Sequence, residues 1–214
     1  MKSSIIDLTK WERGNLFTLF IKDLKCVISL TVDIDVTGLY NWCKSKELKF
    51  FPSFMYIVSK VINQREEFRF GYDDNGSLIL WDEVYPFYAD FHQENESFIK
   101  LVSKYSSNFD TFYQTVINDM EMHKNKKGFE VKFNYKNTFD LSCLPWIHYK
   151  SCDLHIFDSG TYLAPVVTWG KYIKKDNRLI MPLSIQIHHA VADGYHIARF
   201  YSDIEKEMAK LVEE

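Results

Sequence analysis

The stretch Leu179-Ile-Met-Pro-Leu-Ser-Ile-Gln-Ile-His-His189 alternates regularly, and it runs directly into Ala190-Val-Ala-Asp-Gly194. Successive side chains of a strand point to opposite faces, so this period of two predicts a strand from Leu179 to His189. One face ends at His189 and carries the apolar residues Leu179, Met181, Leu183, Ile185 and Ile187. The other face carries Gln186 and His188. The pattern therefore predicts a histidine at the end of a hydrophobic row.

His189 is a candidate general base. Removal of water disfavours the charged form of an imidazole, and a neutral imidazole is the form that accepts a proton in catalysis. A core histidine with a satisfied hydrogen bond is the alternative for His189, and an N-cap of the last helix is the alternative for Asp193. Taken alone, these residues leave both interpretations open.

Other periodicities surround this strand with further elements. Alternation over 26–35 predicts a strand, helical spacing begins at Val36, and Asn75-Gly76 predicts a tight turn. Helices are expected at about 52–65, 108–124 and 197–212, a hairpin over 68–81, and strand-like segments over 84–91, 139–144, 154–157 and 162–173. Strands with a few amphipathic helices between them predict an α/β two-layer sandwich, a mixed β-sheet covered by helices. Without a linker or repeat, residues 1–214 are expected to form a single domain.

The composition describes a folded chain rather than a disordered one. The 214 residues are 46% hydrophobic, 16% aromatic and 26% charged, which provides enough apolar surface to offset the entropy of ordering. The net charge of −3 argues against a broad phosphate-binding surface, so no nucleic-acid partner is expected.

The N-terminal residues and the cysteines indicate where the protein acts. Charged residues interrupt the first ten positions, and the most apolar stretch, 50–58, is far shorter than the ~20 residues of a membrane span. Four cysteines include no Cys-x-x-Cys pair, and a chain of this length needs no disulfide bonds. We therefore expect a cytoplasmic protein with reduced thiols and no membrane association.

The string His188-His-Ala-Val-Ala-Asp-Gly194 matches the His-His-x-x-x-Asp-Gly pattern of acyltransferases that use thioesters of coenzyme A or a carrier. Its surroundings resemble the chloramphenicol acetyltransferase family, and the resemblance covers essentially the entire chain. Matching segments are Trp11-Glu-Arg13, Phe91-His-Gln-Glu-Asn-Glu-Ser-Phe98, Ser142-Cys-Leu-Pro-Trp146 and Tyr162-Leu-Ala-Pro-Val-Val-Thr-Trp-Gly-Lys-Tyr172. The resemblance implies a coenzyme A-dependent acyltransferase-like fold and a homotrimer with active sites at subunit interfaces.

The resemblance also implies a reaction and its catalytic residues. The family transfers the acetyl group of acetyl-coenzyme A to the 3-hydroxyl of chloramphenicol, which inactivates the antibiotic without a covalent acyl-enzyme. His189 corresponds to the general base and Ser142 to the donor that stabilises the tetrahedral oxyanion. Thr168 corresponds to a threonine that helps to hold a water. Asp193 and Arg13 correspond to an ion pair that fixes the geometry.

Binding residues follow from the same resemblance. Those corresponding to coenzyme A contacts are Phe98, Lys171 and Tyr172, which supply aromatic surface for adenine and positive charge for phosphates. Those corresponding to the chloramphenicol pocket are Phe20, Leu24, Cys26, Ile28, Phe129 and Leu154. Acetyl-coenzyme A is thus the expected co-substrate, and no metal is expected.

Three departures from the family concern the acceptor. Phe20 stands where some relatives have tyrosine, Ala192 replaces a common cysteine, and Ile28 is smaller than the aromatic residue of some members. The main alternative is therefore an O-acyltransferase of the same scaffold that acts on a different hydroxyl-bearing small molecule. A non-catalytic ligand-binding protein is a further alternative, although neither His189 nor Ser142 is lost. The lysines between 124 and 136 could also bind an acidic partner.

A metal site is an alternative use of the same motif. His189, Asp193 and His196 would lie on one helical face at i, i+4 and i+7. The strand pattern that runs up to His189, together with Gly194, disfavours a helix there. No Walker loop, Gly-x-Gly-x-x-Gly, Gly-x-Ser-x-Gly or His-Glu-x-x-His string occurs in the sequence.

Overall fold

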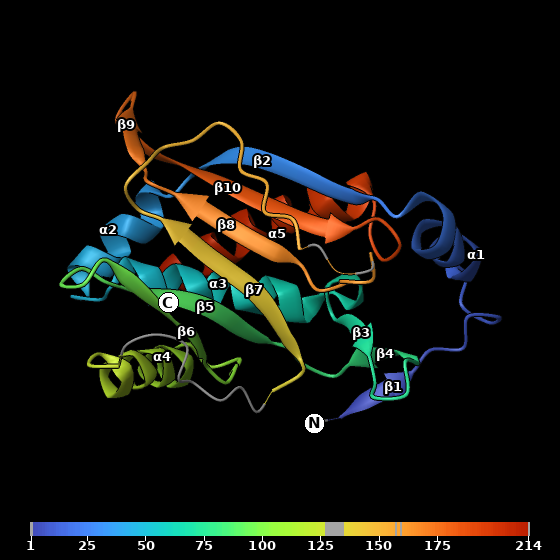
Figure 1. Ribbon diagram of the computed structural model, residues 1–214. Helices are drawn as coiled ribbons and strands as arrows, with labels where there is room; N and C mark the ends of the chain where they lie inside the picture. Colours follow the sequence, from blue (N-terminus) through green and yellow to red (C-terminus); the bar gives the residue numbers. More distant parts are fainter. Residues whose placement is uncertain (1, 127–134, 157, 159, 214) are drawn as a thin grey trace.

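A large mixed sheet forms the centre of the computed structural model, which describes residues 2–126, 135–156, 158 and 160–213. Its strands are β2 (Val27–Asp35), β5 (Tyr85–His92), β6 (Ser97–Val102), β7 (Thr138–Leu144), β8 (Val166–Gly170), β9 (Ile173–Lys175) and β10 (Arg178–His188). They follow the order β2-β10-β8-β7-β5-β6, and β9 pairs with β10 (Figure 1). β7 runs parallel to both of its neighbours, β5 and β8, and all other pairs in this sheet are antiparallel.

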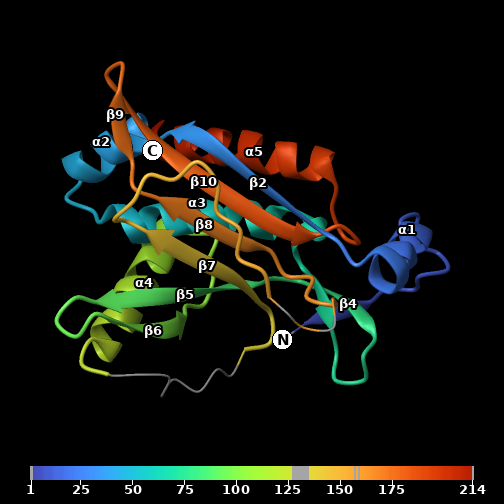
Figure 2. The same cartoon turned by 45° about the horizontal axis from the view of Figure 1, so that its top comes forward.

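Helices cover one face of this sheet. They are α2 (Thr37–Ser45), α3 (Phe50–Gln64) and α5 (Gly194–Glu213), and α4 (Phe109–His123) packs against α3 (Figures 1 and 2). The opposite face, called the open face here, is crossed by the irregular segment between β7 and β8. The predicted α/β sandwich of a mixed sheet covered by helices is therefore confirmed.

The N-terminal part forms a smaller sheet and a short helical arm. Strands β1 (Ser3–Ile5), β4 (Leu78–Trp81) and β3 (Phe70–Tyr72) lie in this order, so the predicted hairpin is confirmed. The arm consists of α1 (Gly14–Leu19) and a π-helix (Phe20–Leu24), and a 3-10 turn (Glu66–Phe68) follows α3. Gly14 is required in the arm, because an added Cβ would lie 2.0 Å from the Leu8 carbonyl oxygen.

Sequence periodicity was wrong at the segment between β7 and β8. Residues 154–156 form no strand, and the backbone N–H of Leu154 donates instead to the side-chain oxygen of Gln186 at 3.2 Å. Phe157 lies outside the described residues. Within 162–173, only β8 and the first residue of β9 are strand. The helical arm, β1 and β6 were not predicted, because elements this short hold too few residues to establish a period.

The strand β10 is buried on both faces. Every residue from Met181 to His188 is buried, because helices cover one face and the irregular segment lies over the other. Two polar residues on the open face pair with each other, since the Ser184 and Thr31 hydroxyl oxygens are 2.7 Å apart. The apolar row of β10 packs into the core, while its polar row belongs to the open face.

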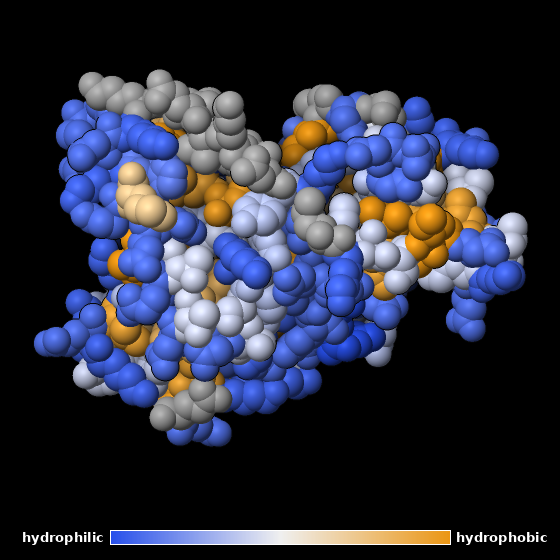
Figure 3. Space-filling model, turned by 90° about the horizontal axis from the view of Figure 1, so that it is seen from below, coloured by the Kyte–Doolittle hydropathy of each residue, from blue (hydrophilic) through white to orange (hydrophobic). Residues whose placement is uncertain are grey.

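The surface carries an apolar region beside the helical arm. Hydrophobic residues gather on the side where α1 and the small sheet lie (Figure 3), and Ile5, Leu16 and Leu19 are exposed there. In the described residues no helix is long and apolar enough to span a membrane. The four cysteines are free thiols.

Buried charges tie α5 to α3. The Lys60 ammonium lies 2.9 Å from a carboxylate oxygen of Glu207, and the Arg65 guanidinium lies 2.6 Å from Asp203. Burial by itself would raise the pKa of Glu207, but hydrogen bonds from Lys210, Lys60 and Gln64 lower it from 4.5 to about 2. The carboxylate of Glu207 is therefore ionised and paired in the folded protein at any pH above this range.

This pair predicts an acid-sensitive stability. Because the folded pKa of Glu207 is depressed, its contribution is present above pH 4.5 and is lost as the pH falls towards 2. The loss is on the order of 3 kcal/mol of unfolding free energy. The test is urea unfolding of both variants at intervals of about 0.5 pH unit between pH 2.5 and 7. The pH-dependent gain in unfolding free energy should be absent in Glu207→Gln and present in the exposed control Glu205→Gln. Equal pH profiles for the two variants would contradict it.

Candidate active site

A tight turn after β10 carries His189. The strand ends at His188, one residue earlier than predicted, and the backbone N–H of His189 donates to the Cys26 carbonyl at 2.9 Å. α5 then begins at Gly194. The ring of His189 is therefore oriented by the turn and by the arm around it, and strand alternation does not determine its direction.

The contacts of the His189 ring fix its tautomer. Its Nδ1 atom lies 2.8 Å from the carbonyl oxygen of Ala192. A carbonyl oxygen only accepts hydrogen bonds, so Nδ1 carries the proton and Nε2 of the neutral ring has the free lone pair. The Phe20 ring stacks on the imidazole with centroids 4.0 Å apart. This arrangement presents Nε2 as a proton acceptor in a defined orientation.

The sequence pattern predicts that His189 is buried, but the buried histidine is the preceding one, His188. His188 is 2% exposed, and burial lowers its pKa. Its Nδ1 atom accepts a hydrogen bond from the backbone N–H of Ala190 at 3.1 Å. His189 is only half-buried, and the hydrogen bond to Ala192 and the stacked Phe20 orient its ring.

Arg13 holds the turn from the arm. Its guanidinium donates to the carbonyl oxygens of His189 at 2.8 Å and Ala190 at 2.7 Å, and to the carboxylate of Asp193 at 3.1 Å. Burial tends to raise the pKa of Asp193, but the hydrogen bond from Arg13 and the electrostatic effect of the neighbouring His196 lower it overall. The ion pair expected from the sequence is thus present, and it binds the turn at three points.

Ser142 and Thr168 lie side by side on the open face. They are in register on the parallel strands β7 and β8, and Thr168 is in turn opposite Ser184 on β10. Ser184 stands opposite Thr31 on β2. A row of hydroxyl side chains therefore crosses the sheet at this level. Ser184 and Thr31 are not among the site residues predicted from the sequence. The signal that could have indicated them is a hydroxyl residue within each of two largely apolar strands.

One chain does not bring His189 close to Ser142. The register aligns Ser142 with Ser184, and His189 lies five residues farther along the chain. At ~3.3 Å per residue and ~4.8 Å between strands, the two α-carbons are separated by about 17 Å along β10 and about 10 Å across the sheet. Both side chains could not touch the same reacting carbon within a single chain.

The residues expected around the acceptor fall into two groups, one near His189 or the core and one exposed to solvent. Phe20 and Cys26 contact His189 directly, and Ile28 packs against the core on β2. Leu24 in the arm is 57% exposed and Leu154 over the open face is 48% exposed. Phe129 lies outside the described residues. Two apolar side chains that were assigned to a pocket are therefore uncovered in the isolated chain.

A cavity of about 550 Å³ contains all three residues expected to bind coenzyme A. Phe98, Lys171 and Tyr172 line it where β7 and β8 end and α3 begins. Two other residues of its lining, Lys49 and Trp146, are not among those predicted from the sequence. Trp146 packs edge-on against Phe91, with ring centroids 4.7 Å apart. The cavity thus combines aromatic surface with two lysines.

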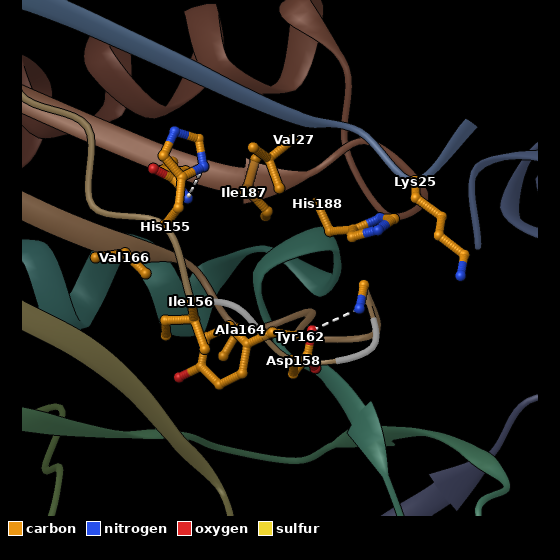
Figure 4. Close-up of a pocket in the computed structure, with 12 residues that line it drawn as sticks. Lys25, Val27, His155, Ile156, Asp158, Tyr162, Ala164, Val166, Ile187 and His188 are labelled. Carbon is orange, nitrogen blue, oxygen red and sulfur yellow. Dashed lines mark hydrogen bonds between the residues drawn. The ribbon is translucent and has the colours of Figure 1, made fainter. Parts of the chain in front are cut away.

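A second cavity, of about 180 Å³, lies where β10 ends on the open face (Figure 4). Lys25, His155, Asp158 and His188 line it. The lining includes neither His189 nor Ser142. Its polar groups therefore do not form the site that the motif predicts.

The structure does not form the helix that the metal alternative requires. α5 starts only at Gly194, and the Nδ1 atom of His196 lies 2.9 Å from Asp193 while that of His189 contacts Ala192. Through the described ranges, no three His, Cys, Asp or Glu side chains gather in a way that could hold a metal ion.

Comparison with solved structures identifies the class of protein. A chain titled chloramphenicol acetyltransferase is similar over 97% of this chain and all of its own, with a TM-score of 0.85 and 26% identity. A probable dihydrolipoamide acetyltransferase from Listeria monocytogenes shares the fold, with a TM-score of 0.65 and 14% identity over 98% and 95% of the two chains. The fold and the His-His-x-x-x-Asp-Gly turn are those of a coenzyme A-dependent acyltransferase.

Comparison of sequences identifies the family. The family model described as chloramphenicol acetyltransferase matches residues 1–205. A chloramphenicol acetyltransferase of Clostridium butyricum is 38% identical over 207 residues, which cover 96% of this chain and 94% of the relative. The chain belongs to the chloramphenicol acetyltransferase family, as the sequence resemblance predicted.

Proposed function

We propose that the protein transfers the acetyl group of acetyl-coenzyme A to the 3-hydroxyl of chloramphenicol and thereby inactivates the antibiotic. The observation that carries this proposal is the state of His189. Its Nδ1–H is bound by the Ala192 carbonyl, so Nε2 is the proton acceptor, in a chain of this family. Membership of the family supports the acceptor and the co-substrate, and the ring geometry supports the chemistry.

In this mechanism His189 moves one proton. Nε2 takes the proton of the acceptor hydroxyl as that oxygen bonds to the thioester carbonyl carbon. The imidazolium is stabilised by the carbonyl of Ala192 and the face of Phe20. When the tetrahedral intermediate collapses, the carbon–sulfur bond breaks and the proton of Nε2 passes to the leaving thiolate. Neutral His189 is restored without a covalent acyl-enzyme.

Ser142 is the proposed donor to the tetrahedral oxyanion. A single donor of this kind typically contributes ~2.7–4 kcal/mol in the transition state. Thr168 stands next to Ser142 in the hydroxyl row, which suits the proposed role of holding a water there. Arg13 and Asp193 act as positioning residues, because they bind the turn that carries His189.

The cavity of about 550 Å³ is the proposed site for the coenzyme A end of the co-substrate. Lys49 and Lys171 would attract its phosphates, and Trp146, Tyr172 and Phe98 offer ring faces for adenine. The cavity lies at the strand ends just beyond Ser142, so a thioester extending from it could reach the hydroxyl row.

A homotrimer with active sites between subunits is the proposed assembly, each subunit acting as a single domain of 1–214. The separation of His189 from Ser142 supports it, because a site complete in both residues needs two chains. The exposed Leu24 and Leu154 also support it, as does the apolar surface beside the arm (Figure 3). Free cysteines are consistent with a proposed location in the reducing cytoplasm.

Release of free coenzyme A thiol tests the proposed function. The expected result is rapid thiol release from acetyl-coenzyme A only when chloramphenicol is present, with 3-O-acetylchloramphenicol as the product by mass spectrometry. If the folded, trimeric protein releases no thiol with chloramphenicol but does so with another hydroxyl-bearing compound, the assignment of the acceptor is wrong and the alternative O-acyltransferase holds.

A further inference from the structure

A lysine occupies the open face at the level of Ser142. Lys100 on β6 stands opposite Ala89 on β5. The parallel register pairs Tyr88 with Leu141, so the next residues, Ala89 and Ser142, are also level. The side chains of Lys100, Ala89 and Ser142 therefore share one face and one row. Only the methyl group of Ala89 lies between the lysine and the serine in that row.

The ammonium of Lys100 on β6 contacts side chains of β5 and β7. It lies 4.1 Å from the centroid of the Phe87 ring and 3.6 Å from a carboxylate oxygen of Asp140, and its side chain is 23% exposed. Asp140 also accepts a hydrogen bond from the Tyr162 hydroxyl. Phe87 and Asp140 are level with each other, two residues before Ala89 and Ser142. The ammonium is thus about 7 Å along the strands from the hydroxyl of the proposed oxyanion donor.

Stability alone does not explain this arrangement. Burial lowers the pKa of Lys100 although Asp140 opposes the effect, so the ammonium loses more hydration than its partner restores. Apolar residues of similar volume commonly serve a fold as well as a partly buried ion pair does. A lysine retains three donors, and Asp140 is the one carboxylate recorded within ion-pair distance of Lys100 across the described residues. Donor capacity is therefore available to a ligand on the open face.

We propose that Lys100 is a specificity-determining residue that binds a neutral, oxygen-bearing group at the far end of the acceptor. This rests on the proposed function, because the acceptor's hydroxyl must reach Ser142. The pair of Lys100 and Asp140 is neutral overall, so a polarised but uncharged group such as nitro fits it. A carboxylate would face repulsion from Asp140. The nitrophenyl end of chloramphenicol has the chemistry that this subsite takes.

Binding measurements test the proposal without turnover. Calorimetry compares chloramphenicol with two analogues in which hydrogen or a carboxylate replaces the nitro group. We expect the wild type to bind chloramphenicol about tenfold more tightly than the hydrogen analogue, since a hydrogen bond to a charged donor has this strength. Lys100→Met, which keeps the length of the side chain, is expected to abolish this preference. Lys104→Met, an exposed lysine just beyond β6, is expected to preserve it.

Kinetics and a second variant make the test decisive. A group remote from the reacting carbon binds ground and transition states alike, so Lys100→Met should raise KM for chloramphenicol and leave kcat unchanged. Asp140→Asn should improve binding of the carboxylate analogue, and this arm stands if Lys100→Met does not fold. An equal tenfold preference in Lys100→Met, or equal weakening for both uncharged acceptors, overturns the proposal. If the Lys100 proposal fails but the wild type still releases thiol with chloramphenicol, the proposed function stands. If the wild type releases no thiol, the proposed function itself is wrong.

Discussion

Replacement of His189 by alanine is expected to lower kcat/KM for acetyl transfer to chloramphenicol by about 10²–10⁴-fold, the range of a positioned general base. The loss follows because Nε2 is the atom that the Ala192 hydrogen bond leaves free to take the proton. The fall should occur mainly in kcat, since the ring acts as a base only during bond formation. Initial rates of thiol release measure it.

The controls separate chemistry from folding. His123→Ala on α4 removes a histidine whose ring bonds to the backbone carbonyl of Asp119, outside the proposed site, and its rate should equal that of the wild type. A His189→Ala variant that retains more than about a tenth of the wild-type rate would exclude His189 as the base.

Two inactive variants are expected to restore activity when they assemble together. His189→Ala subunits keep Ser142, and Ser142→Ala subunits keep His189. The Ser142→Ala homotrimer alone should be about 10²–10³-fold slower than the wild type. If each site takes His189 from one chain and Ser142 from its neighbour, random co-assembly at equal amounts makes about a quarter of the sites complete. Co-expressed variants should therefore recover about a quarter of the wild-type rate.

The mixture needs two comparisons. Separately purified homotrimers that are mixed without unfolding contain no mixed trimers, so they should stay inactive. Wild-type subunits co-expressed in equal amounts with subunits that carry both substitutions should give about a quarter of the wild-type rate if the site is shared, and about half of it if each site lies within one chain. Mass measurement identifies the mixed trimers. If mixed trimers form and remain inactive, the site is completed within one chain and the proposed interface is wrong.

The sequence by itself determined the sheet and the motif. Long periods of two or of three to four residues define β2, β10, α3, α4 and α5, because a repeated apolar position must face the core wherever the element lies. The string from His188 to Gly194 and the segments around Arg13, Ser142 and Lys171 carried the family, which the comparisons confirmed. The ion pair of Arg13 and Asp193 also followed from it.

Tertiary structure decided how these residues can act. Which nitrogen of His189 carries the proton depends on the Ala192 carbonyl, and burial falls on His188 instead. The distance between His189 and Ser142 depends on the register of β7, β8 and β10, which no local pattern encodes. The same register brings Lys100 level with Ser142 from a strand about forty residues away along the chain. Periodicity reports only which side of an element is buried, whereas catalysis depends on atoms that meet across elements, and the pairing of strands sets those meetings.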